Sequence, residues 1–121
     1  MSINYKDIWE TYQSSWNTTS ASEKLARFEQ TMDKNAVYQD PLAKTKTWDE
    51  LVAYMSDFHQ QVPDSKFTTT YFQAHNNQSI ATWDMTLADG TVAIQGISHC
   101  AYNDAGKLVS MSGFYELPPK A

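Results

Sequence analysis

The chain has 121 residues, of which 41% are hydrophobic and 13% aromatic, and this composition indicates one globular domain over residues 1–121 and excludes a disordered chain. Its net charge is −5 and its 9 Lys and Arg residues are not clustered, so we expect no nucleic acid and no membrane as a partner. No apolar run approaches the ~20 residues of a transmembrane helix, and the polar start MSINYKDIWE has no apolar signal-peptide core. We therefore expect a cytoplasmic protein.

The first third of the chain predicts two helices. Apolar residues recur at helical spacing between Tyr5 and Trp16, which predicts an amphipathic helix. Ser20 precedes Glu23 with the spacing of a capping box, in which each side chain accepts a hydrogen bond from the other residue's backbone N–H. We expect the second helix to begin there and to end near residues 34–35.

The middle of the chain predicts a short extended segment and a third helix. The segment AVYQDP, residues 36–41, contains an Asp-Pro pair, and a residue that precedes proline is shifted away from the helical conformation. Thr47 and Glu50 form a second capping-box pattern. Apolar residues at helical spacing follow this pattern, and Pro63 ends the predicted helix.

The second half predicts four strands. The segments KFTTTYFQA, SIATWDMTL, TVAIQGISHCAY and KLVSMSGFYEL are rich in β-branched and aromatic residues or alternate between apolar and polar ones. Asp89-Gly90 and the segment NDAG are turn signals between them. Three helices followed by this four-strand meander, with one short strand before it, predict an α+β domain with the helices on one face of a curved antiparallel sheet. Such a cone-shaped roll forms a pocket at its open end.

Three stretches resemble one family of known proteins. VYQDPLA resembles an acid-Asp-Pro loop after a second helix, TYQSSWN a first helix that carries a tyrosine, and ISHCAYNDAGKLVSMSGFYE two final strands around a glycine turn. Together they resemble the nuclear-transport-factor-2-like superfamily, in particular its SnoaL-like and ketosteroid-isomerase-like branch. The resemblance covers about residues 5–117. It implies the same cone-shaped fold and a homodimer formed through the sheet.

The resemblance also implies catalytic residues. The isomerases of this branch move a proton next to a ketone, and they use a carboxylate base and hydrogen-bond donors to the developing oxyanion. Carried over to this sequence, the base falls on Asp40, the main oxyanion donor on Tyr12, and the second donor on Ser98. The family has a neutral carboxylic acid at this last position, and losing one oxyanion donor typically costs ~2.7–4 kcal/mol. The serine therefore favours a weaker or different proton transfer.

Aromatic residues supply candidate walls of the pocket. The predicted ligand-binding residues are Tyr38, Trp48, Phe58, Trp83 and Phe114. His59 and His75 have no partner at metal-binding spacing, and strand alternation turns His99 away from Ser98, so we expect no metal. No cofactor is expected either, because a base and oxyanion donors suffice for enolisation.

Two functions remain open from the sequence. One is a cofactor-free isomerase or cyclase that acts on a hydrophobic carbonyl-type small molecule, with Asp40 as general base and Tyr12 as oxyanion donor. The other is a non-catalytic module of the same fold that binds a small ligand or a protein partner. The enzyme hypothesis requires that Tyr12 and Asp40 face one enclosed space. If the Asp40 carboxylate instead points to solvent or bonds the amides of its own turn, the catalytic hypothesis is dropped and the non-catalytic module remains.

Overall fold

The structure is a computed structural model, and it describes residues 3–116. Three α-helices and one short 3₁₀ helix come from the first half of the chain: α1 (Tyr5–Ser14), η1 (Ser15–Asn17), α2 (Ala21–Thr31) and α3 (Trp48–Gln61). The strands are β1 (Met32–Gln39), β2 (Lys44–Thr45), β3 (Lys66–His75), β4 (Gln78–Thr86), β5 (Val92–Tyr102) and β6 (Leu108–Phe114). The described residues contain no helix that is long and apolar enough to cross a membrane.

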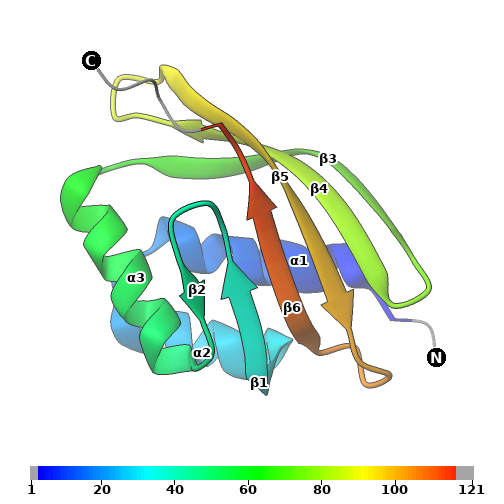
Figure 1. The fold of residues 1–121 in the computed structure, drawn as a ribbon. Helices are drawn as coiled ribbons and strands as arrows, with labels where there is room; N and C mark the ends of the chain where they lie inside the picture. Colours follow the sequence, from blue (N-terminus) through cyan, green and yellow to red (C-terminus); the bar gives the residue numbers. More distant parts are fainter. Residues whose placement is uncertain (1–2, 117–121) are drawn as a thin grey trace.

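All of these strands belong to one curved sheet (Figure 1). Its strand order is β2-β1-β6-β5-β4-β3, and β3 to β6 form the predicted antiparallel meander. Two details differ from the prediction of five antiparallel strands. A two-residue strand, β2, is added beside β1, because the Asp-Pro loop folds the chain back on itself. In addition, β1 pairs with β6 in parallel, with Met32 opposite Leu108.

The second helix is shorter than predicted. It ends at Thr31, and β1 begins at Met32 without an intervening loop. The pairing of Met32 with Leu108 at the start of β6 explains this early end, because it adds sheet hydrogen bonds and buries both side chains. Tertiary pairing here overrides the helical pattern of the local sequence.

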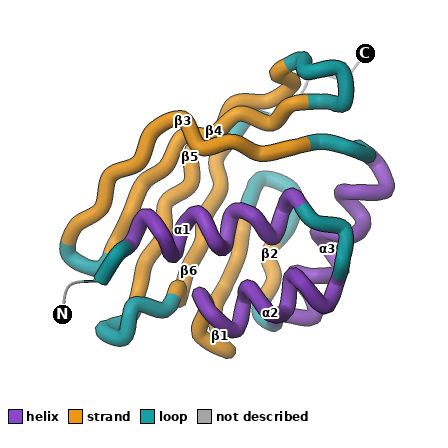
Figure 2. Tube along the Cα trace, turned by 180° about the vertical axis from the view of Figure 1, so that it is seen from behind, coloured by secondary structure: helices purple, strands orange, loops and turns teal. Residues whose placement is uncertain are grey.

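The helices cover one face of the sheet (Figure 2). Helix α1 contacts β3, whereas α2 and α3 contact β1. As predicted, Ser20 and Thr47 cap α2 and α3, and each side chain accepts a hydrogen bond from the backbone N–H three residues on. The return half of the second capping box is absent, because Glu50 accepts from the backbone N–H of Lys46 instead. These caps fix where each helix starts, and thereby which of its faces meets the sheet.

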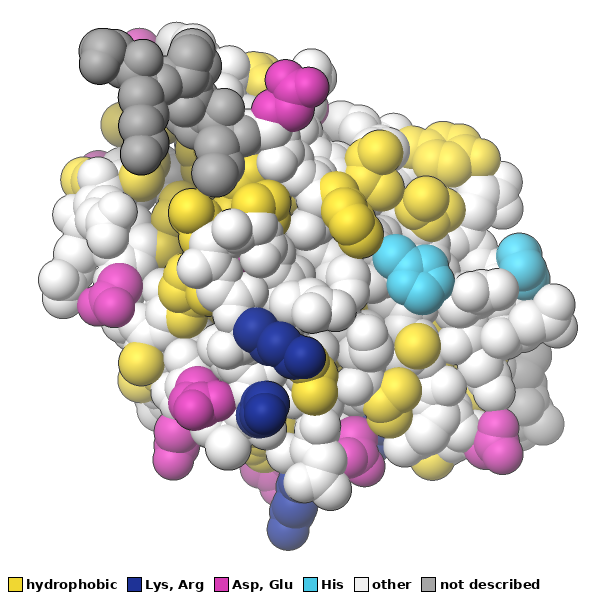
Figure 3. Space-filling model, viewed as in Figure 1, with side chains coloured by type: hydrophobic (Ala, Val, Ile, Leu, Met, Phe, Trp, Pro, Cys, Tyr) yellow, Lys and Arg dark blue, Asp and Glu magenta, His cyan; other side chains and the backbone are white. Residues whose placement is uncertain are grey.

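No helix of residues 3–116 covers the other face of the sheet. Tyr71, Ile97 and Phe114 lie in one row across β3, β5 and β6, joined through Thr82 of β4, and all three are exposed large hydrophobic residues. Figure 3 shows hydrophobic side chains gathered on this face beside a histidine. His99 lies on this outer face, as strand alternation predicted, and its Nε2 pairs with Gln78.

A close approach between β4 and β5 shapes the inner face of the sheet. Gly96 lies opposite Trp83, and a Cβ atom added to the glycine would lie 2.2 Å from the indole Cζ2. The indole therefore lies flat across the glycine backbone. Only glycine leaves room for this arrangement.

We expect Gly96→Ala to destabilise the fold by about 1–3 kcal/mol, because the methyl group overpacks against Trp83. The free energy of unfolding is measured by urea denaturation. Gly113→Ala is the matched control on the neighbouring strand, since its Cβ would lie 3.6 Å from the nearest atom, an ordinary contact. Equal stability of Gly96→Ala and the unmodified protein would contradict this account of the inner face.

Candidate functional site

A pocket opens between the helices and the inner face of the sheet. Its volume is about 60 Å³. One buried water needs only about 10–15 Å³, whereas sites for drug-sized ligands start near 300 Å³. Its walls are formed by Trp9, Tyr12, Gln13, Trp16, Tyr38, Asp40, Tyr54, Phe58, Phe67, Trp83, Met85, Ile94, Ser98, Gly113 and Tyr115. The pocket therefore suits a compact molecule.

The three predicted catalytic residues lie on the wall of this one pocket. Tyr12 comes from α1, Asp40 from the loop after β1, and Ser98 from the middle of β5. They are far apart in the sequence, and the curvature of the sheet around α1 brings them together. The geometric condition of the enzyme hypothesis, that Tyr12 and Asp40 share one space, is met.

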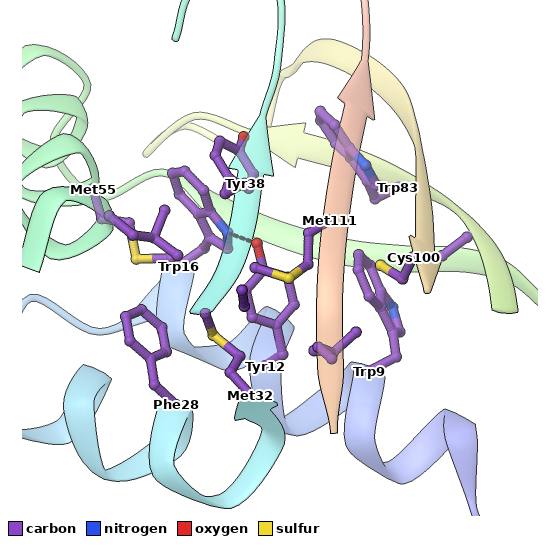
Figure 4. Close-up of a cluster of buried hydrophobic side chains, with 14 of the residues drawn as sticks. Trp9, Tyr12, Trp16, Phe28, Met32, Tyr38, Met55, Trp83, Cys100 and Met111 are labelled. Atoms are coloured by element: carbon purple, nitrogen blue, oxygen red, sulfur yellow. Dashed lines mark hydrogen bonds between the residues drawn. The ribbon is translucent and has the colours of Figure 1, made fainter. Parts of the chain in front are cut away.

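Tyr12 presents a neutral hydroxyl to the pocket. The side chain is 2% exposed, and its oxygen accepts a hydrogen bond from Trp16 Nε1 at 3.0 Å (Figure 4). No acceptor for the hydroxyl proton lies among residues 3–116. Burial raises the pKa of Tyr12 well above its ordinary value. The phenol therefore keeps its proton and can donate it to a ligand.

Ser98 repeats this arrangement on the sheet. Its Oγ accepts a hydrogen bond from Trp83 Nε1 at 3.0 Å, which occupies the acceptor side of the hydroxyl. Within the described part of the chain, the Ser98 proton also has no acceptor. Trp83 can reach Ser98 because it lies across Gly96, two residues earlier in β5. Two indole N–H groups thus leave two hydroxyl protons available at the same pocket.

Asp40 is held by four hydrogen bonds. Its Oδ2 accepts from the hydroxyls of Tyr38 at 2.6 Å and Tyr54 at 2.8 Å. Its Oδ1 accepts from the backbone N–H groups of Leu42 at 2.8 Å and Ala43 at 3.0 Å, in the turn that Asp40 itself begins. A carboxylate has about four lone-pair positions, so these donors fill it. Asp40 thus lines the pocket but also bonds the amides of its own turn, which counts against the catalytic hypothesis, and it can take a proton from a ligand only after one donor moves away.

The phenols around Asp40 stay protonated. Burial, followed by the charge of Asp40 and the hydrogen bond to it, raises the pKa of Tyr54. The pKa of Tyr38 is raised well above its ordinary value by burial first, with Tyr12 and Asp40 adding to it. The pKa of Tyr115 is raised by burial and by Asp40. The hydroxyl groups that surround the Asp40 carboxylate are therefore neutral.

Three of the five predicted wall residues line the pocket, namely Tyr38, Phe58 and Trp83. The prediction was wrong for Trp48, the first residue of α3, whose ring packs against Phe28 and whose Nε1 donates to the carbonyl of Asp33 at 3.0 Å. Hydrogen bonding and packing hold it on the side of α3 that faces α2.

The prediction was also wrong for Phe114. This side chain is 61% exposed, because β6 alternates and directs Gly113 toward the pocket and Phe114 to the outer face of the sheet. Tyr115, which follows, lines the pocket. Consecutive residues on one strand face opposite sides, so this alternation is the sequence signal that separates them.

Two polar residues of the pocket escaped the sequence analysis. Tyr54 lies four residues before Phe58 on α3, and Gln13 lies four residues after Trp9 on α1. Both therefore share a helix face with a pocket residue, and this spacing is the signal that could have identified them.

The remaining walls, as far as the described residues form them, carry no cationic group. Trp16 contacts Phe67 at a ring-centroid distance of 5.6 Å, and Phe67 contacts Trp83 at 5.3 Å, which closes the pocket with aromatic rings. No Lys or Arg of residues 3–116 lines the pocket, so none of their cationic side chains is placed to pair with an anionic ligand. Residues 3–116 also contain no cluster of three His, Cys, Asp or Glu side chains that could hold a metal ion. The arrangement suits a neutral, mainly apolar molecule with an acceptor atom.

We expect Asp40→Asn to lower the free energy of unfolding by about 2–4 kcal/mol, because one acceptor oxygen becomes an NH₂ group and its two donors lose their partner. Urea denaturation measures the loss. Tyr54→Phe removes one of the four bonds and serves as the graded comparison. An Asp40→Asn variant as stable as the unmodified protein would show that these bonds do not hold the loop.

Comparisons with known proteins agree with this fold. The family model of the SnoaL-like domain matches residues 12–111, so the chain belongs to the SnoaL-like family. No curated protein matches the chain. Among solved structures, a proposed isomerase of the SnoaL-like family from Agrobacterium tumefaciens str. C58 is similar, with 22% identity, a TM-score of 0.86, and coverage of 93% of this chain and 97% of that one.

More distant structures share the same architecture. A proposed ketosteroid isomerase from Kribbella flavida DSM 17836 has 16% identity and a TM-score of 0.71, over 97% of this chain and 81% of that one. A proposed polyketide cyclase from Sinorhizobium meliloti has 10% identity and a TM-score of 0.71, over 88% of this chain and 93% of that one. At these identities the likeness shows the fold, and the function has to be argued from the pocket.

Proposed function

We propose that the protein binds a compact, neutral, mainly apolar molecule through a carbonyl oxygen that accepts hydrogen bonds from Tyr12 and Ser98. The observation that carries this proposal is the pair of pocket hydroxyls, each with an indole donor on its oxygen and no acceptor for its proton among the described residues. A carbonyl oxygen supplies the acceptor, and the aromatic walls accommodate the apolar remainder.

The chemistry that fits this pose is proton transfer next to the carbonyl group. Asp40 would remove a proton from the adjacent carbon, and the electron pair of the broken C–H bond would move onto the carbonyl oxygen to form an enolate. Tyr12 and Ser98 would stabilise that oxyanion, and return of the proton to another carbon would complete an isomerisation. Attack of the enolate carbon on a second carbonyl would give a cyclisation. Similar structures described as a proposed isomerase and a proposed cyclase support this class.

Movement of Tyr54 would be a step of this mechanism. The Tyr54 hydroxyl occupies Oδ2 of Asp40 together with Tyr38, so the base would gain a free lone pair when Tyr54 withdraws. Tyr54 is the candidate because it comes from α3 and is only half buried, whereas Tyr38 is 8% exposed and belongs to the sheet. A bound ligand that occupies the space beside Oδ2 would take its place.

A second candidate function is a non-catalytic binding module. The observation that favours it is the saturation of Asp40, half of which comes from the amides of its own turn. In that case the carboxylate would only anchor the two tyrosines, and the ligand would bind without reacting. The two functions make different predictions for carbon-bound protons.

Cyclohexanone tests both, because its α-protons exchange with D₂O only through the enolate, and NMR follows binding and exchange in the same sample. For the enzyme we expect accelerated exchange that falls about 10²–10³-fold in Tyr12→Phe and at least as much in Asp40→Asn. Tyr54→Phe should keep or raise the exchange rate, because it frees one lone pair of Asp40. Binding of cyclohexanone without accelerated exchange in the unmodified protein would rule out the enzyme and leave the binding module.

We also propose that the outer face of the sheet pairs two copies of the chain. Polar side chains beside the exposed row already bond to each other, as Gln95 does to Asp84 and Thr70 to Thr82, so the apolar side chains remain available for a partner. A two-fold axis on the row would bring each apolar residue onto the same patch of the second copy. The assembly rests on this exposed patch and on the family resemblance.

The test of the dimer is Ile97→Asp, which places a charge at the centre of the row. We expect it to shift the molar mass from dimer to monomer by light scattering coupled to size exclusion, because burying an unpaired carboxylate is unfavourable. Ala26→Asp, on an exposed position of α2, is the control and should remain dimeric. A monomeric unmodified protein at the same concentration would exclude the proposed dimer.

A further inference from the structure

The pocket contains one polar group to which the proposed function gives no task. Gln13 is 5% exposed and lines the pocket beside Tyr12. Its Nε2 is fully buried and has no hydrogen-bond partner among residues 3–116. Because Gln13 lies four residues after Trp9 and three before Trp16, the helix places its carboxamide on the same buried face as the two indoles.

The surroundings of this amide do not satisfy it. Trp9, one turn earlier on α1, directs its own N–H to Thr69 at 2.8 Å, and Met85 and Ile94, which line the same pocket, offer only apolar surface. A buried amide without a partner destabilises the folded state, and an apolar side chain of similar size would avoid that cost. The position thus lowers stability in the free protein, which is expected of a group that is reserved for a ligand.

Three side chains of the pocket have donor protons without an acceptor among residues 3–116. Tyr12 and Ser98 each have a free hydroxyl proton, and Gln13 has free amide N–H groups, whereas the acceptor oxygens of Asp40 are occupied. The ligand must therefore supply acceptors. One carbonyl oxygen between the two hydroxyls leaves the amide of Gln13 unpaired.

We infer that Gln13 is a second polar anchor of the pocket and that the ligand carries a second oxygen acceptor in addition to its carbonyl group. This inference rests on the proposed function for the first anchor. The ligand class is narrowed to compact dioxygenated molecules, such as diketones, keto esters and hydroxyketones. Rotation about the Cγ–Cδ bond of Gln13, a torsion with a broad energy minimum, turns the N–H group toward the bound oxygen.

Cyclohexanone and 1,4-cyclohexanedione form a matched pair of probes, because they share a six-membered ring and differ by one acceptor oxygen. NMR titration gives the Kd of each probe for the unmodified protein and for Gln13→Met, which keeps the length of the side chain and removes its N–H groups. We expect the unmodified protein to bind the dione about three- to tenfold more tightly, the equivalent of one net hydrogen bond. Gln13→Met should lose this preference and bind the two probes with similar affinity.

Two results would overturn the inference. One is a preference for the dione that persists in Gln13→Met, and the other is an equal loss of affinity for both probes, which would mean that Gln13 only shapes the pocket. Tyr12→Phe separates this from the proposed function, since it should weaken both probes and keep the preference for the dione. If neither probe binds the unmodified protein, the proposed function fails and the stability of Gln13→Met decides the role of Gln13.

The stability measurement needs no ligand. A reserved, unpaired amide predicts that Gln13→Met unfolds at the same temperature as the unmodified protein or several degrees higher. A Tm that falls by several degrees would show that the amide is paired in the folded protein, and the second anchor would then be excluded.

Discussion

The carboxylate of Asp40 joins three separately encoded parts of the pocket wall. Its Oδ1 closes the turn after β1, and its Oδ2 binds Tyr38 of β1 and Tyr54 of α3. The sheet and α3 are therefore both hydrogen-bonded to this one group. A single charged residue therefore sets where the loop ends, where the helix lies and how the tyrosines point into the pocket. Its replacement affects the fold and the site together.

Indole donors give the pocket its chemical character. Trp16 and Trp83 each donate the indole N–H to a hydroxyl oxygen, so the hydroxyl protons of Tyr12 and Ser98 are available to a ligand. In a small cavity with aromatic walls such donors are strong, because the low local dielectric strengthens each hydrogen bond. The same surroundings make the unpaired amide of Gln13 unfavourable. The pocket thus exchanges some stability for the ability to bind acceptor atoms.

Whether the pocket could catalyse a reaction or only bind a ligand depends on the position of the Tyr54 side chain. With Tyr54 in place, Asp40 has no lone pair for a substrate proton, and the proposed ligand would bind without reacting. With Tyr54 withdrawn, Asp40 would be able to act as the proposed base and Tyr12 and Ser98 as the proposed oxyanion donors. The volume of the cavity is only about 60 Å³. A larger ligand would therefore have to displace the half-buried residues of α3, which include Tyr54.

The sequence predicted the helix starts well because capping is local. Ser20 and Thr47 bond a backbone N–H only three residues away, and the turn at Asp89-Gly90 follows from the positive φ that Gly90 adopts. Strand alternation likewise placed Ser98 and His99 on opposite faces, because the period of two belongs to the strand itself. The same alternation separates the exposed Phe114 from Gly113 and Tyr115, which line the pocket, and the prediction of Phe114 as a wall residue did not apply it.

The sequence by itself determined the α+β class, the helix starts and the meander, and it predicted that Tyr12, Asp40 and Ser98 line one pocket, since local patterns and a family resemblance carry these. Only the tertiary structure decided that α2 gives way to a strand at Met32, that Tyr54 binds Asp40, and that Gln13 is buried without a partner. Each of these depends on contacts between segments distant in the chain. No local pattern encodes such contacts, because they arise only when the curved sheet closes around the helices.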